Sequence, residues 1–201
     1  QMGPAALLQC GGLAVLAALV SIAFCVLMHE SSHLYKKYIP NQYLRALAGA
    51  ALVIVLTLAE GSGDYNGAGG HIIELAVEGQ VHVPWAFLWK MLFTALTLGA
   101  GFRGGEIVPT LFIGSTFGCA AGPLFGLDPA FGAAISMIAL FCGVVNCPLA
   151  SIFLAIELFG GDGLLFFALA CALSFLVSGR YSLYSSQKIV YSKLEARLNE
   201  Q

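Results

Sequence analysis

The chain has 201 residues, of which 59% are hydrophobic and only 10% are charged, and its formal net charge is −2. Ordinary soluble domains hold roughly 25% charged residues, so the composition excludes a typical soluble domain, and the small net charge indicates no nucleic-acid partner. Residues 1–28 and 129–156 contain no charged side chain, a pattern typical of membrane helices. We therefore class the chain as an all-α polytopic membrane protein.

Apolar runs predict the helices in chain order. A first span at Leu7–Met28 continues through a polar turn to Lys37, and a second span follows the break at Pro40. The later predicted segments are Tyr43–Ala59, the short His71–Val77, Pro84–Leu98, Ile107–Phe125, Phe131–Val145, Pro148–Phe159, Leu164–Val177 and an amphipathic helix at Leu183–Leu198. The six cysteines form no Cys-x-x-Cys pair and are predicted to be small buried apolar residues.

Several of these segments are shorter than the ~20 residues that cross a bilayer. Gly, Pro and Asn residues separate them, and helices broken in this way leave unpaired backbone N–H groups at membrane depth. Such helix ends occur where they line a cavity or hold an ion. Basic residues cluster near Lys36 and near the C-terminus, and the positive-inside tendency places both clusters on the cytoplasmic side.

The stretch from Leu98 to Gly118 carries one carboxylate, Glu106, at the start of a long apolar run. Gly104 and Gly105 allow a tight turn close to a ligand, and Pro109 suits the first turn of the helix that follows. The residues Glu106, Ile107 and Val108 would then present free N–H groups at the positive end of the helix dipole. This pattern predicts a site for a small anion.

Glu106 is also a candidate for proton coupling. An ionised carboxylate would repel a neighbouring anion, whereas a protonated one could donate a hydrogen bond, so proton and anion occupancy would be linked. The alternative is a helix-start acid that only complements the dipole, but ionisable groups inside membrane segments are functional candidates by default. Downstream, a stripe of Gly114, Gly118 and Gly122 predicts close helix packing.

A competing motif is HESSH, in which His29, Glu30 and His33 fit the H-E-x-x-H pattern of zinc proteases. The histidines would share one helix face and Glu30 could activate a metal-bound water. His71, His82 and Asp128 are the candidates for a third ligand, and none has a strong sequence signature. The alternative is a polar helix end at the membrane interface.

The segment GGEIVPTLFIGSTFG resembles the G-x-F-x-P segment of the CLC family of anion channels and proton-coupled exchangers, with Ile107 at the usual Phe position. YLRALAGAAL, earlier in the chain, resembles the family's helix before the glycine-rich loop, and NCPLASIFLAIELFGG and SLYSSQKIV resemble later segments of the same family. The last implies that a tyrosine hydroxyl reaches the central anion, at Tyr184 with Tyr181 as the nearby alternative.

The resemblance covers only the second half of a CLC protomer, which is built from two inverted halves. It implies that residues 1–201 are the C-terminal half of a transmembrane domain, the second inverted repeat with short, broken and tilted helices, whose first half would supply the gating glutamate. The expected partners are fluoride or chloride, protons, the lipid bilayer, the missing N-terminal half and, in the full-length protein, a second copy joined through Pro148–Phe159 and Leu164–Val177. The expected location is a bacterial inner membrane.

Glu106 directs the resemblance towards the fluoride/proton antiporter branch, which has an acid after the paired glycines, although some fluoride exporters carry a hydroxyl residue where this chain has Val108. A chloride channel or exchanger is the alternative. Glu157 is interpreted as a helix-end residue. An enzyme, a cofactor and a metal are not expected, and a zinc protease is the least favoured interpretation.

Metal content discriminates between the transporter and protease interpretations. We expect the purified protein to hold no stoichiometric zinc, because HESSH has no third ligand with a signature of its own. Elemental analysis of the purified protein measures this. One zinc per chain that disappears in His29→Ala would contradict the expectation and favour the protease.

Overall fold

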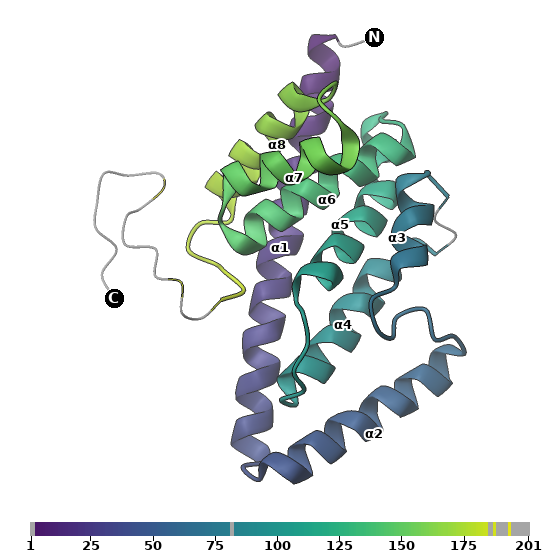
Figure 1. Ribbon diagram of the computed structural model, residues 1–201, viewed down its shortest axis with the longest axis vertical. Helices are drawn as coiled ribbons and strands as arrows, with labels where there is room; N and C mark the ends of the chain where they lie inside the picture. The colour runs from purple at the N-terminus through teal and green to yellow at the C-terminus, as the bar shows by residue number, and fades with distance from the viewer. Residues whose placement is uncertain (1–2, 81–82, 185–186, 188–192, 194–201) are drawn as a thin grey trace.

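A computed structural model describes residues 3–80, 83–184, 187 and 193, and within these ranges every regular element is helical (Figure 1). α1 runs along the molecule, and α4, α6 and α8 pack against it. α2 lies apart from the main body and contacts α4. The elements are α1 Pro4–Tyr38, α2 Gln42–Glu60, α3 Gly70–Val77, α4 Ala86–Gly99, α5 Ile107–Ala121, η1 Gly122–Phe125, α6 Pro129–Val145, α7 Pro148–Phe159 and α8 Leu164–Val177.

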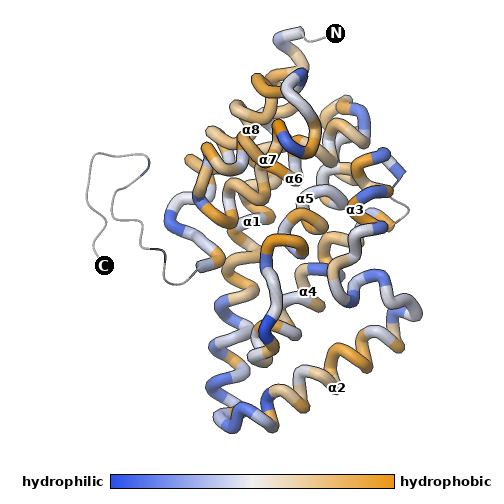
Figure 2. Tube along the Cα trace, in the orientation of Figure 1, coloured by the Kyte–Doolittle hydropathy of each residue, from blue (hydrophilic) through white to orange (hydrophobic). Residues whose placement is uncertain are grey.

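The helix lengths suit insertion into a membrane. α1, α2 and the continuous segment Ile107–Phe125 are long and apolar enough to cross a bilayer, whereas α4, α6, α7 and α8 are shorter apolar helices. Figure 2 shows polar residues gathered at the lower end of α1 and in connecting loops, with apolar residues along the helices. The predicted pattern of long and interrupted apolar segments is therefore confirmed.

The predicted continuation of the first span beyond Met28 is confirmed, because α1 stays helical through HESSH to Tyr38. The hydroxyl of Ser31 lies 3.0 Å from the carbonyl oxygens of both Met28 and Ala95, so this polar face of α1 packs on α4. The helix stops before Pro40. Asn41 then caps α2 by accepting the N–H of Tyr43 at 2.9 Å.

The helix predicted at Leu183–Leu198 is not seen in the part of that range that the structure describes. Leu183, Tyr184, Gln187 and Lys193 are non-helical, and the other residues of that range lie outside the described ones. The N–H of Leu183 donates to the carbonyl of Val144 at the end of α6, 3.1 Å away. This bond joins the segment after α8 to the end of α6.

Close packing of α5 on α6 rests on glycine. A Cβ atom built on Gly118 would lie 2.2 Å from the carbonyl oxygen of Gly132, and one on Gly114 would lie 2.6 Å from the Cα of Met137. Only hydrogen side chains permit this approach of two backbones. The predicted packing stripe is confirmed. Its contact with α6 holds α5 in place, and with it the first turn of α5.

Cysteine burial follows the prediction at five positions and departs from it at one. Cys147 is exposed, because it occupies the N-cap position of α7 at the joint with α6. The thiol of Cys142 lies 3.4 Å from the carbonyl oxygen of Cys171, which joins α6 to α8 inside the core.

The glycine contact gives a stability prediction. Gly118→Ala should destabilise the protein by about 1–3 kcal/mol, because the new methyl group overlaps the α6 backbone. Gly161→Ala is the matched control, since its Cβ would meet no atom within 4 Å. Thermal unfolding of both variants in detergent measures the difference, and equal melting temperatures would show that α5 and α6 can separate without cost.

Candidate anion-binding site

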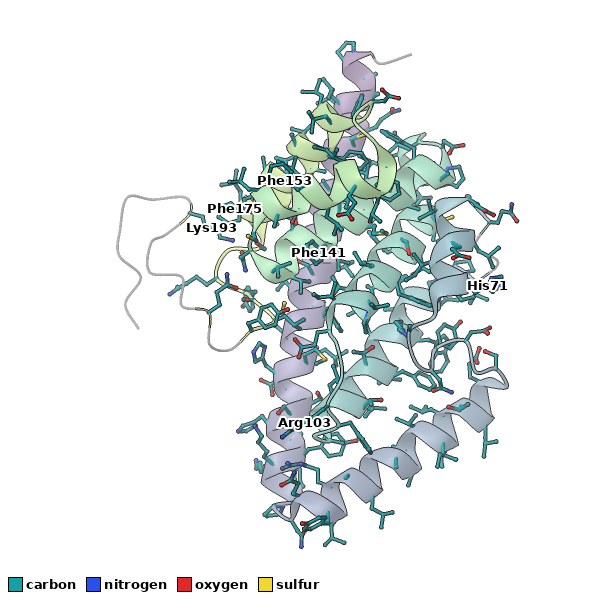
Figure 3. All side chains as sticks on the ribbon, in the orientation of Figure 1. His71, Arg103, Phe141, Phe153, Phe175 and Lys193 are labelled. Atoms are coloured by element: carbon teal, nitrogen blue, oxygen red, sulfur yellow. The ribbon has the colours of Figure 1, made fainter. Side chains whose placement is uncertain are left out.

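The loop between α4 and α5 carries the chain back to the middle of the molecule, and α2 holds its start in place. Gly101 has a φ of 97°, a left-handed conformation suited to glycine. Beside it, the Nε of Arg45 donates to the carbonyl of Ala100 at 3.2 Å. Arg103, by contrast, is exposed and lies near the lower end of the loop (Figure 3).

The first turn of α5 begins at Ile107, with Glu106 in the N-cap position. The carbonyl of Glu106 accepts both the N–H of Thr110 at 3.2 Å and its hydroxyl at 2.7 Å. Pro109 sits in the first turn, where its missing N–H leaves no helical bond unmade. These bonds set the direction of the helix start.

The N–H groups of Glu106, Ile107 and Val108 donate to no other described residue. The Glu106 side chain makes no capping bond to them, and Ile107 and Val108 are 47% and 39% exposed. Three donors at the positive end of a helix dipole thus face outward from the chain. Chemically, such an arrangement can hold one small anion.

The carboxyl of Glu106 is partly buried and acts electrostatically on two side chains of α1, His29 and Cys25. The Nδ1 of His29 lies 2.8 Å from the carbonyl oxygen of Cys25, so a proton on Nδ1 is donated within α1. The other ring nitrogen then remains available for a different partner. One residue of the HESSH motif therefore stands near the predicted anion site.

HESSH itself shows no metal-binding arrangement in the described residues. His29, Glu30 and His33 are exposed on α1, and no group of three His, Cys, Asp or Glu side chains within the described ranges is placed to hold a metal. His82, one of the candidate third ligands, lies outside the described residues.

Tyr184 makes no hydrogen bond to the first turn of α5 among the described residues. Its side chain is 38% exposed, and its N–H donates to the hydroxyl of Ser182 at 3.2 Å. The amide of Asn146 holds the segment by donating to the carbonyl of Tyr181 at 2.7 Å. Glu106, Ile107 and Val108 thus lie at the helix start with Gly104, Gly105 and Pro109, and the segment that carries both tyrosines has an anchor at the end of α6.

Lys193 strengthens that anchor. Its ammonium group donates to the side-chain oxygen of Asn146 and to the carbonyl of Phe175 at 2.7 Å, and it lies 4.0 Å from the centroid of the Phe175 ring. Figure 3 shows Lys193 beside Phe175, below Phe153 of α7. Burial lowers the pKa of Lys193 to about 8. The segment after α8 is therefore tied to α6 and α8.

A cavity of about 430 Å³ adjoins the first turn of α5. Gly104, Gly105, Val108 and Pro109 line it, together with Lys90 of α4. Sequence reasoning missed Lys90. The available signal was a single charge inside the apolar run Pro84–Leu98, the same signal that identified Glu106.

Residues 1–179 match the family described as "Voltage gated chloride channel". The "Chloride/fluoride channel protein" of Pseudomonas syringae pv. tomato is 37% identical over 193 residues, which are 93% of this chain and 42% of that protein. The "H(+)/Cl(-) exchange transporter ClcA" of Vibrio vulnificus is 31% identical over 105 residues, covering 47% of this chain and 22% of the relative.

A solved structure, described as a crystal structure of "a CLC-type fluoride/proton antiporter", superposes with a TM-score of 0.90 at 29% identity. The match covers 94% of this chain and 48% of that one. This chain spans less than half the length of these relatives. It has the CLC-type helical fold, and it belongs to the voltage gated chloride channel family.

Proposed function

We propose that residues 1–201 form the C-terminal half of a CLC-type transmembrane domain that exchanges a small anion, fluoride, for protons. The observation that carries this proposal is the first turn of α5, where the N–H groups of Glu106, Ile107 and Val108 have no acceptor among the described residues. Similarity to a fluoride/proton antiporter and to a chloride/fluoride channel protein supports the transport class.

The anion is held by backbone donors because such donors are fixed in direction. Removing water from a small anion is costly unless strong hydrogen bonds replace it. Three amide groups on one helix turn supply part of that replacement, and the helix dipole supplies a favourable potential. Gly104 and Gly105 leave the approach free of side chains. No step of this mechanism requires a cofactor or a metal.

Glu106 couples the anion to a proton in this mechanism. In its ionised form the carboxylate repels an anion at the adjacent amide groups. In its protonated form it loses the repulsion and gains an O–H donor, which suits fluoride as a strong acceptor. Occupancy of the site by the anion is therefore linked to the protonation of Glu106.

Tyr184 supplies a further hydroxyl donor to the anion in this proposal, and Tyr181 is the alternative. The segment that carries both tyrosines is anchored on the end of α6 through Asn146, so it is held at a fixed place relative to the helix core. A hydroxyl donor fits an anion site chemically. The remaining ligands, including the gating glutamate, belong to the N-terminal half.

The assembled protein is proposed to be a homodimer in a bacterial inner membrane. α7 and α8 expose large apolar side chains, including Leu149 at 71%, Phe153 at 70% and Leu165 at 65%. Such faces are covered by lipid or by another helix surface. The proposed dimer buries the α7 and α8 faces, and α2 exposes its apolar residues to lipid.

Chloride transport, by a channel or an exchanger, is the second candidate. The family description and the chloride/proton exchanger from Vibrio vulnificus favour it. Val108 also favours it weakly, because an apolar side chain adds no donor for fluoride.

Glu106→Gln tests the coupling role in the complete transporter, in which this chain is joined to its N-terminal half. We expect proton flux to fall at least ~100-fold relative to anion flux, because the amide cannot carry a proton but can still donate a hydrogen bond. Paired anion and proton measurements on proteoliposomes provide the ratio. Glu157→Gln, the same change at an exposed position of α7, is the matched control. Unchanged coupled exchange in Glu106→Gln would remove the proposed role of this residue.

Fluoride selectivity is tested by efflux from the same proteoliposomes. We expect fluoride to leave at least ~10-fold faster than chloride at equal gradients, a difference of about 1.4 kcal/mol in favour of the stronger hydrogen-bond acceptor. Protein-free liposomes measure the leak of each ion. Chloride efflux as fast as fluoride efflux would favour the chloride alternative.

A further inference from the structure

The cavity beside α5 has walls from four parts of the chain. It lies between α2, the glycine-rich loop at residues 61–69, α4 and the first turn of α5, and its volume is about 430 Å³. Val53 represents α2, Ala68 the loop and Thr97 the helix α4, while Gly105 and Val108 form the end nearest the candidate anion site. The space therefore leads from the loop to the free amide groups.

Lys90 is the one charged residue among those lining the cavity. Its side chain is 1% exposed, a rare environment for lysine. The ammonium donates to the carbonyl of Gly67 at 2.6 Å and to that of Tyr65 at 3.2 Å, and it lies 4.8 Å from the centroid of the Phe112 ring. Two of its three N–H donors are therefore used within the chain.

No carboxylate in the described part of the chain pairs with Lys90. Glu60, the last residue of α2, accepts the N–H and the hydroxyl of Ser62 at 3.0 and 2.6 Å, and Asp64 of the glycine-rich loop is exposed. Burial, with a smaller contribution from these two acids, raises the pKa of Tyr65, which keeps its hydroxyl neutral. The cavity wall thus carries one positive charge without a paired acid.

We propose that this cavity is a second anion site, an antechamber in which Lys90 holds a monovalent anion before it reaches the first turn of α5. The inference rests on the proposed transport function and adds a residue and a place to it. A buried charge without a paired acid attracts anions strongly, because low-dielectric walls focus its field into the open space. The glycines at the far end allow the ion to pass close to the backbone.

A purely structural role for Lys90 is the competing explanation. Its two carbonyl partners, Tyr65 and Gly67, belong to the glycine-rich loop, so the lysine also fastens that loop to α4. Arginine can keep both the charge and the carbonyl bonds, whereas methionine keeps only the apolar stem. The two explanations predict different anion binding in a variant that folds but lacks the charge of Lys90.

Lys90→Met and Lys90→Arg in the complete transporter provide the first test. We expect Lys90→Met to raise the anion concentration at half-maximal flux about tenfold or more, while Lys90→Arg stays within about threefold of the unchanged protein. Flux into proteoliposomes at varied fluoride concentration measures this. An unchanged half-maximal concentration in a folded Lys90→Met variant would overturn the proposal.

Charge-selective labelling provides a second test that does not depend on transport. Thr97→Cys places a thiol on the cavity wall, and methanethiosulfonate reagents of similar size carry either a sulfonate or a trimethylammonium group. The labelling rate of the anionic reagent is divided by that of the cationic reagent, and the same ratio for free cysteine is the reference. We expect the ratio at Thr97→Cys to exceed this reference about tenfold, and we expect Lys90→Met to abolish the preference. Mass spectrometry of the Thr97 peptide measures both rates. Equal normalised rates with Lys90 present would overturn the proposal.

The outcomes separate this proposal from the transport function on which it rests. If Glu106→Gln uncouples protons from anions while both Lys90 tests fail, the antechamber is wrong and the proposed function stands. If the complete protein moves no anion while the labelling preference is found, the cavity binds anions and the transport proposal is wrong.

Discussion

The backbone N–H groups at the start of α5 are the constraint on which the site depends. In a membrane, an unsatisfied backbone donor costs several kcal/mol, so a helix that begins in apolar surroundings needs a substitute for water. The described chain supplies none to Glu106, Ile107 or Val108. A mobile anion is a natural acceptor for such a helix start, because it can satisfy several donors and later leave.

The surrounding structure keeps those donors in place. The glycine contact between Gly118 and Gly132 holds α5 against α6 at backbone distance, and Arg45 holds the loop that leads into α5. Thr110 adds a hydroxyl bond to the carbonyl of Glu106. Because this backbone is already ordered, a ligand binds without the entropy cost of ordering it.

The sequence predicted most of the helices, because apolar runs bounded by Gly, Pro and Asn are a strong local signal. It failed where a distant contact decided the outcome. The residues after Ser182 were predicted to be helical from their amphipathic pattern, yet Leu183 bonds to Val144 on α6. The contact of Lys90 with two carbonyl groups of the glycine-rich loop joins residues that are far apart in the sequence. The only local signal for it was one charge in an apolar run.

HESSH and Lys90 illustrate why burial is more informative than a short motif. Three fixed positions match a protease pattern, yet those side chains are exposed and no metal cluster forms among the described residues. Lys90 matches no motif, yet it is buried beside the cavity that ends at the residues flanking Glu106. Lys90 lines this cavity, and Glu106 follows Gly105, which lines it too. If Glu106 is ionised, its charge opposes the field of Lys90 and holds an anion back; once it is protonated, the positive field extends to the amide groups. The proton on Glu106 would then control both the binding site and the approach to it.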